Sequence, residues 1–292
     1  MVRFGYADTA MGQVHFRRAG TGDPLLLLGS SGRSSSIFEG LLPLLAPHFD
    51  AVAIDTPGFG RSCALPPGTT IEQLAGCAAS VLDALGIEHC HLYGLHTGNK
   101  IATAFAGRWP ERVDRMVLAG QSHSLIPDRL RRNETILAIV QSYFAPPVPA
   151  PFTELADWAA IFARLGAAWW DRSLVGAGAS ADARRIARNA ALDEMLSEGT
   201  TELYRANFAY DLGAGFAAIR APVTVLEIVT PEEDRTLGRQ GEVVAGLIPG
   251  ALIRTIAEPG GHTLTLENRA QDLAAIIVEA LRPAAELSGP TS

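Results

Sequence analysis

The stretch HLYGLHTGNK, residues 91–100, joins a short apolar run to a pair of glycines that flank His96 at a spacing of two residues. Its centre, GLHTG (94–98), differs at one position from G-x-S-x-G, the sequence of a sharp, strained turn from a strand into a helix. In that turn the central side chain stands above the end of the sheet. We therefore expect a strand before the turn, a helix after it, and His96 exposed between them.

Strand and helix patterns alternate on both sides of this stretch. Residues 1–19 alternate polar and apolar side chains around DTAMG, which predicts a β-hairpin. The later strands are continuous apolar runs, as in a parallel sheet covered on both faces, and they lie near 24–29, 50–60, 89–94, 113–120, 222–229 and 251–258. Amphipathic helices are expected between them, for example within 69–86. The fold class is therefore α/β, a mostly parallel, doubly wound sheet with helices on both faces.

The alternation stops between residues 124 and 216. This span has helical stretches separated by the proline-rich APPVPAPF (145–152) and contains no strand pattern. We expect an inserted helical cap over residues 124–216 and a core domain made of 1–123 and 217–292. Aromatic residues of the cap are candidates for an apolar pocket: Tyr143, Phe144, Trp158, Phe162, Trp169, Trp170, Tyr204 and Tyr210.

Composition narrows the class of partner. The chain has 292 residues, a formal net charge of −7 and no run of basic residues, which disfavours nucleic acid and favours a small molecule. The first residues lack a signal-peptide pattern and no apolar run could span a bilayer, so we expect a cytoplasmic protein without membrane attachment. The three cysteines are scattered, which argues against a zinc site, and we expect no metal and no cofactor. The sequence leaves a homodimer open.

Four segments in this order resemble the α/β-hydrolase superfamily. They are the GLHTG turn, DTPGFGRS (55–62), RWPERVDRMVLAG (108–120) and IPGALIRTIAEPGGHTLTLEN (248–268). The resemblance covers nearly the whole chain and implies the α/β-hydrolase fold with a helical cap. The turn departs from the family pattern because His96 occupies the place of the nucleophilic serine.

The resemblance also implies a general base and an acid that orients it. His262 follows Gly260-Gly261 where the family carries its catalytic histidine. The acid should follow the strand at 222–229, and Asp234 of TPEED (230–234) is the better match, with Glu233 as the substitute. An oxyanion hole would use the backbone N–H groups of Thr97 and Ser31.

The resemblance implies an enzyme that acts on a small, mostly apolar substrate through an ester, lactone or C–C bond. His96 could attack an acyl group directly, or His96 and His262 could form a proton-handling pair. Two alternatives stay open on this sequence. One is a non-hydrolytic enzyme of the same fold, with lyase, proton-abstraction or cofactor-free chemistry, and the other is a ligand-binding protein without catalysis.

Overall fold

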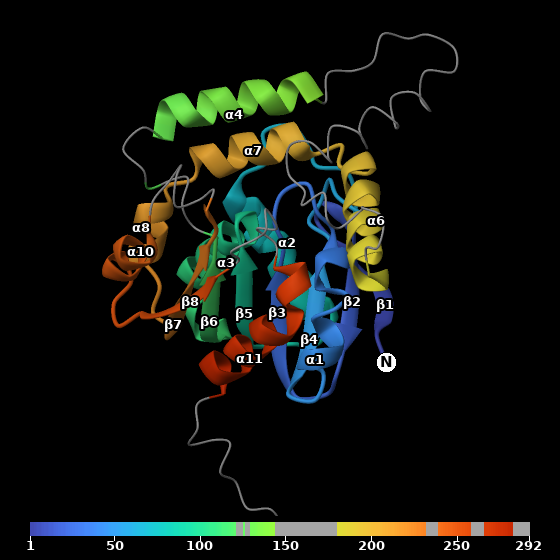
Figure 1. Ribbon diagram of the computed structural model, residues 1–292, viewed down its shortest axis with the longest axis vertical. Coiled ribbons are helices and arrows are strands. Elements are labelled where there is room, and N and C mark those ends of the chain that lie inside the picture. The colour runs from blue at the N-terminus through green and yellow to red at the C-terminus, as the bar shows by residue number, and fades with distance from the viewer. Residues whose placement is uncertain (121–124, 126–128, 144–179, 232–238, 258–265, 283–292) are drawn as a thin grey trace, which may run out of the picture.

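The chain folds around one eight-stranded sheet with helices on both faces (Figure 1). This computed structural model describes residues 1–120, 125, 129–143, 180–231, 239–257 and 266–282. Among these residues every helix is too short or too polar to cross a bilayer.

The strand order in the sheet is β1-β2-β4-β3-β5-β6-β7-β8. The first two strands form the predicted antiparallel hairpin, β2 also pairs antiparallel with β4, and all other neighbours are parallel. The strands are β1 (Arg3–Thr9), β2 (Gly12–Ala19), β3 (Asp23–Leu28), β4 (Phe49–Ile54), β5 (Cys90–Leu95), β6 (Val113–Ala119), β7 (Val223–Val229) and β8 (Leu252–Ala257). The fold class and the predicted strands are confirmed.

The central strands are apolar throughout because both of their faces are covered. In β3, Leu26 and Leu28 enter the core on one face, while Leu25 and Leu27 enter the core on the other. This follows from the two-residue period of side chains along a strand. A leucine run without polar interruption is therefore the pattern that a central parallel strand requires.

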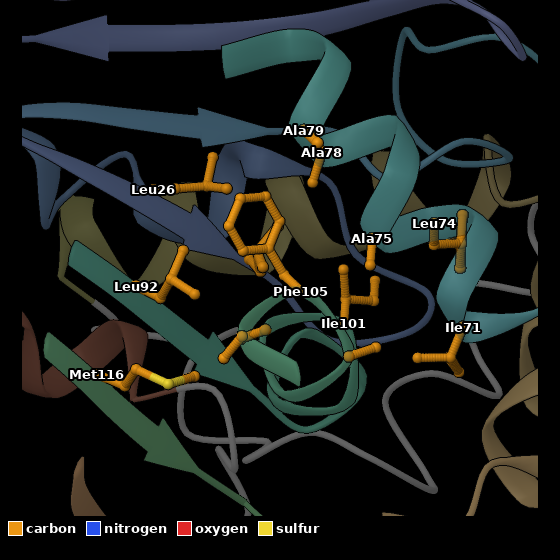
Figure 2. Packing of buried hydrophobic residues seen from close by; sticks show 14 of the residues in the cluster. Leu26, Ile71, Leu74, Ala75, Ala78, Ala79, Leu92, Ile101, Phe105 and Met116 are labelled. Atoms are coloured by element: carbon orange, nitrogen blue, oxygen red, sulfur yellow. The ribbon is translucent and has the colours of Figure 1, made fainter. Parts of the chain in front are cut away.

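The first face of the sheet is covered by four helices, α2 (Ile71–Ala84), α3 (Thr97–Arg108), α8 (Leu212–Ala217) and α10 (Gly241–Leu247). Phe105 of α3 lies between Leu26 and Leu92 of the sheet and the apolar side of α2 (Figure 2). Helix α2 begins with a capping box, in which Thr70 and Gln73 each bind the other's backbone N–H. This core holds α3, and with it the GLHTG turn, firmly against the sheet.

The second face is covered by α1 (Leu42–Leu45), α11 (Ala270–Leu281) and a 3-10 helix at Ser35–Phe38. Two further 3-10 helices lie at Pro110–Arg112 and Glu267–Arg269.

Helices α4 (Arg129–Tyr143) and α7 (Thr200–Ala209) lie across the end of the sheet where β3, β5 and β6 terminate, and α6 (Ala181–Met195) stands upright on the side of β1 and β2 in this view (Figure 1). Helix α4 packs on α7, and α6 contacts the 3-10 helices at 35–38 and 267–269. The elements that the structure describes within the proposed cap span, 124–216, are thus helices.

Candidate active site

His96 occupies a strained turn between β5 and α3. Its backbone has φ 52° and ψ −105°, a conformation that side-chain-bearing residues rarely adopt and that costs about 1–3 kcal/mol. Its N–H donates to the Ala119 carbonyl at 2.9 Å, which continues the β5–β6 ladder by one residue. The turn predicted from GLHTG is present, with histidine at its tip.

The glycines of the turn are required by close backbone contacts. A Cβ on Gly98 would lie 2.0 Å from the Leu28 carbonyl oxygen, and a Cβ on Gly94 would lie 2.6 Å from the Asn99 Cα. Neither contact involves a side chain that could move away. The amino terminus of α3 is therefore pressed against the ends of β3 and β5, and only glycine fits at 94 and 98.

A backbone carbonyl orients the imidazole of His96. Its Nδ1 lies 3.0 Å from the Gly120 carbonyl oxygen, so Nδ1 carries a hydrogen and donates it. Gly120 follows β6 with φ +64°, and a Cβ there would lie 2.3 Å from Nδ1. In the neutral ring this tautomer puts the lone pair on Nε2, the nitrogen that can accept a proton or attack a carbonyl.

Ser31, Thr97 and Asn207 form a hydrogen-bonded cluster beside the turn. The Ser31 and Thr97 hydroxyl oxygens are 2.5 Å apart. Asn207 of α7 donates from Nδ2 to Thr97 Oγ1 at 2.7 Å and to Ser31 Oγ at 3.1 Å. The structure thus brings the two residues predicted for the oxyanion hole into direct contact and adds Asn207, which the sequence did not indicate.

The backbone N–H groups of Ser31 and Thr97 are the donors predicted for an oxyanion hole. Within the described ranges, neither N–H donates to any protein acceptor. Thr97 is the first residue of α3, where N–H groups point out of the helix and the helix dipole favours negative charge. These are the properties of donors that stabilise an oxyanion.

Asn207 is 4% exposed, and its Oδ1 has no hydrogen-bond partner among the residues that the structure describes. A buried acceptor left unpaired costs about 1–3 kcal/mol. The cluster therefore contains one polar atom that the described part of the chain does not satisfy.

Lys100 lies one helical turn beyond Thr97 and is also buried. No carboxylate in the described part of the chain pairs with it, and burial lowers the pKa of its amine to about 8. Near neutral pH this lysine is a cation held in an apolar setting at the cost of desolvation.

A buried ionic network supports the loop that carries Ser31. The Arg33 guanidinium binds Asp193 of α6 at 3.0 Å and Glu267 at 2.7 and 3.1 Å. Ser34 and Ser36 donate to the same Asp193 carboxylate at 2.5 and 2.6 Å. The two carboxylates raise the pKa of Arg33, although desolvation by burial opposes this. Three segments that are distant in sequence are thus fixed around one cation.

His262, Asp234 and Glu233 lie outside the described residues, so the predicted base and acid are not located. The described residues contain no group of three or more histidine, cysteine or carboxylate side chains arranged for a metal, and Cys63, Cys77 and Cys90 are not disulfide-bonded.

The family model for the alpha/beta hydrolase fold matches residues 23–226, more than half of the chain. The chain belongs to this family. The matched span runs from β3 through the GLHTG turn to β7, and so includes the residues of the site described above.

Similar proteins agree on this fold. A 2-hydroxy-6-oxononadienedioate/2-hydroxy-6-oxononatrienedioate hydrolase of Paraburkholderia phymatum is 34% identical over 114 residues, which are 37% of this chain and 40% of that protein. The chain thus aligns with less than half the length of this relative. A hydrolase from Pseudomonas aeruginosa has a TM-score of 0.73 at 24% identity, covering 96% of this chain and 98% of the other. An enol-lactonase from Burkholderia xenovorans has a TM-score of 0.71 at 20% identity, covering 95% and 99%.

Proposed function

We propose that this member of the alpha/beta hydrolase fold is a hydrolase for a small, mostly apolar carbonyl substrate with an ester, lactone or C–C bond to be cleaved. The observation that carries the proposal is the oriented imidazole of His96, held at the tip of the strained turn beside two N–H groups, those of Ser31 and Thr97, which donate to no acceptor in the described residues. The names of the relatives, which include a hydrolase and an enol-lactonase, support the same class of reaction.

In the proposed reaction His96 acts as a general base through Nε2. A water oxygen forms a bond to the substrate carbonyl carbon while its proton passes to Nε2, and the carbonyl oxygen becomes an oxyanion. The N–H groups of Ser31 and Thr97 stabilise this charge. When the intermediate collapses, the bond to the leaving group breaks and that group takes the proton from the imidazolium.

The proposal also includes a second histidine with its acid, and a cap domain. His262, oriented by Asp234 or Glu233, would share the proton with His96, as the family resemblance implies. Residues 124–216 would form the cap over the substrate, with core residues 1–123 and 217–292 beneath it. The contact of Asn207 with Ser31 and Thr97 supports a role for this span at the site.

Direct attack of His96 Nε2 on the substrate carbonyl carbon is the competing hydrolytic route. Replacement of the imidazole tests both this route and the general-base route. His96→Ser restores G-x-S-x-G between glycines that already fit the turn. We expect this variant to form an acyl-enzyme with p-nitrophenyl acetate, seen as a burst and by mass spectrometry, while hydrolysis of the wild-type substrate falls. Wild-type protein should turn over activated esters without a covalent intermediate.

The results of these experiments distinguish general-base hydrolysis from direct attack and from a function other than hydrolysis. A trapped acyl-imidazole on His96 in the wild type would replace the general-base route by direct attack. A folded His96→Ser variant without esterase activity, together with an inactive wild type, would contradict a hydrolase and favour lyase chemistry or ligand binding.

Gly120→Ala tests whether the orientation of the ring matters. The added methyl would occupy the space of Nδ1, so we expect hydrolysis to fall at least tenfold while the fold is kept. Gly86→Ala is the matched control, because Gly86 has φ +69° and nothing within 4 Å of the added methyl. Equal activity of the two variants would show that the Gly120 contact does not serve the reaction.

A further inference from the structure

The side chains of Ser31, Thr97 and Asn207 make three polar contacts with one another. The number of hydrogens available for these contacts decides which end of the Asn207 amide, Nδ2 or Oδ1, faces the two hydroxyl groups. With Nδ2 facing the hydroxyls, its two hydrogens serve the contacts to Ser31 and Thr97, and one hydroxyl hydrogen serves the contact between them. With Oδ1 in that place, three oxygen–oxygen contacts would share two hydroxyl hydrogens. The amide oxygen therefore points away from the hydroxyls.

The same count leaves one hydroxyl hydrogen unused. Thr97 is 4% exposed, and every acceptor it reaches among the described residues belongs to the cluster, so its hydrogen is best placed on Ser31 Oγ. The unused hydrogen then belongs to Ser31, which is only half-buried. The cluster thus offers a ligand one donor, the Ser31 O–H, and one acceptor, Asn207 Oδ1.

We propose that Asn207 is a specificity residue that recognises a hydroxyl on the substrate carbon next to the reacting carbonyl. Such a hydroxyl donates to Asn207 Oδ1 and accepts from the Ser31 O–H, which satisfies both unused groups at once. The adjacent carbonyl would then face the backbone N–H groups of Ser31 and Thr97. This inference rests on the proposed function for the placement of the carbonyl, and it narrows the substrate class to α-hydroxy acyl compounds.

A substrate without that hydroxyl would leave the buried Asn207 Oδ1 unpaired. Sites built to bind a hydroxyl reject the analogue that lacks it, because the polar groups of the protein then lose their partner. A carboxylate in the same position would also be disfavoured, since it has no hydrogen to give to Oδ1.

Two amides that differ only in the hydroxyl test this independently of turnover: mandelamide and 2-phenylacetamide. Their binding to the whole protein can be measured by calorimetry or by ligand-detected NMR. We expect wild-type protein to bind mandelamide about tenfold or more tightly than 2-phenylacetamide, as for a hydrogen bond made in a buried site.

Three variants of α7 test whether Asn207 causes the preference for mandelamide. Asn207→Leu has neither amide atom and should bind both compounds equally. Asn207→Asp keeps an acceptor in the position of Oδ1, but its second oxygen accepts the Ser31 hydrogen that the ligand would otherwise receive, so the preference for mandelamide should be reduced and not abolished. Arg205→Gln, on the exposed side of the same helix, should bind as wild type.

Equal binding of the two amides by wild-type protein, or binding of neither, overturns the inference. A preference that persists in folded Asn207→Leu also overturns it. If Asn207→Leu does not fold, the wild-type ratio and the Asp variant still decide the question. Because ester hydrolysis is measured separately through the His96 variants, failure here leaves the proposed reaction standing.

Discussion

The imidazole of His96 is oriented by its backbone neighbours. The Gly120 carbonyl selects the tautomer, and the positive φ of residue 96 lifts the ring above the ends of β5 and β6. The imidazole thereby acquires a fixed direction. The general-base role that we propose for it depends on that direction.

Lys100 makes a residue-scale prediction about pH. Its folded pKa of about 8 lies below the unfolded value of 10.5, so between these pH values the unfolded chain binds more protons and stability rises with pH. Below pH 8 the full cost of the buried charge is present, and above 10.5 it is absent. We expect Lys100→Met to stabilise the protein at pH 7 by on the order of 3 kcal/mol.

Urea unfolding of wild type and Lys100→Met at pH 7 and pH 10 measures this difference. The stability gain should shrink steadily as the pH rises between the two conditions. A gain that is the same at both pH values would mean that packing, not charge, explains it.

At the scale of elements, one cation joins parts of the chain that no local pattern connects. Arg33 follows β3, Asp193 lies on α6, and Glu267 opens the short helix before α11. The network holds the loop of Ser31 from two sides. The position of that N–H donor therefore depends on residues that do not touch the site.

Removal of the cation should show this dependence. Arg33→Met leaves two carboxylates buried without their partner, and we expect a loss of about 3–5 kcal/mol in the free energy of unfolding. Arg254→Met, which breaks an exposed pair with Glu279, should cost at most about 1 kcal/mol. Chemical denaturation of both variants makes the comparison, and similar losses would contradict a structural role for the network.

The Arg33 network and the contact of Asn207 with Thr97 join residues that are distant in sequence, and sequence analysis could not predict such contacts. Apolar runs such as that of β3 and the GLHTG glycines have local causes, a two-residue period and close backbone contact, so strands, turn and fold class could be predicted. Thr97 lies in the GLHTG turn and Ser31 lies in the loop after the first parallel strand, so the family resemblance could indicate both as candidates. Asn207 could not be, because it meets Thr97 across 110 residues and has no pattern around it. Gly120 carried a weak signal, a glycine directly after a strand.

At the scale of the whole molecule, α7 is part of the main core and not only a cover for the site. Leu203 of α7 is fully buried in the same cluster as Leu92 of β5 and Phe105 of α3. Phe216 of α8 joins it as well. Helices α7 and α8 therefore share the stability of the sheet.

We expect Leu203→Ala to lower the unfolding free energy by about 2–5 kcal/mol, as in the centre of a core, with one transition and an unchanged m-value. Leu130→Ala on α4, whose side chain is 72% exposed, should change it by less than about 0.5 kcal/mol. A separate early transition in Leu203→Ala would show instead that α7 unfolds apart from the sheet.

The fit of the glycines at 94, 98 and 120 has a consequence for how such a protein changes over time. An added Cβ would meet backbone atoms at 94 and 98 and the His96 ring at 120, whereas residue 96 itself already carries a side chain at its unusual φ. The reactive group that we propose at residue 96 can therefore be exchanged over evolutionary time by one substitution, while the glycines that shape the turn stay in place.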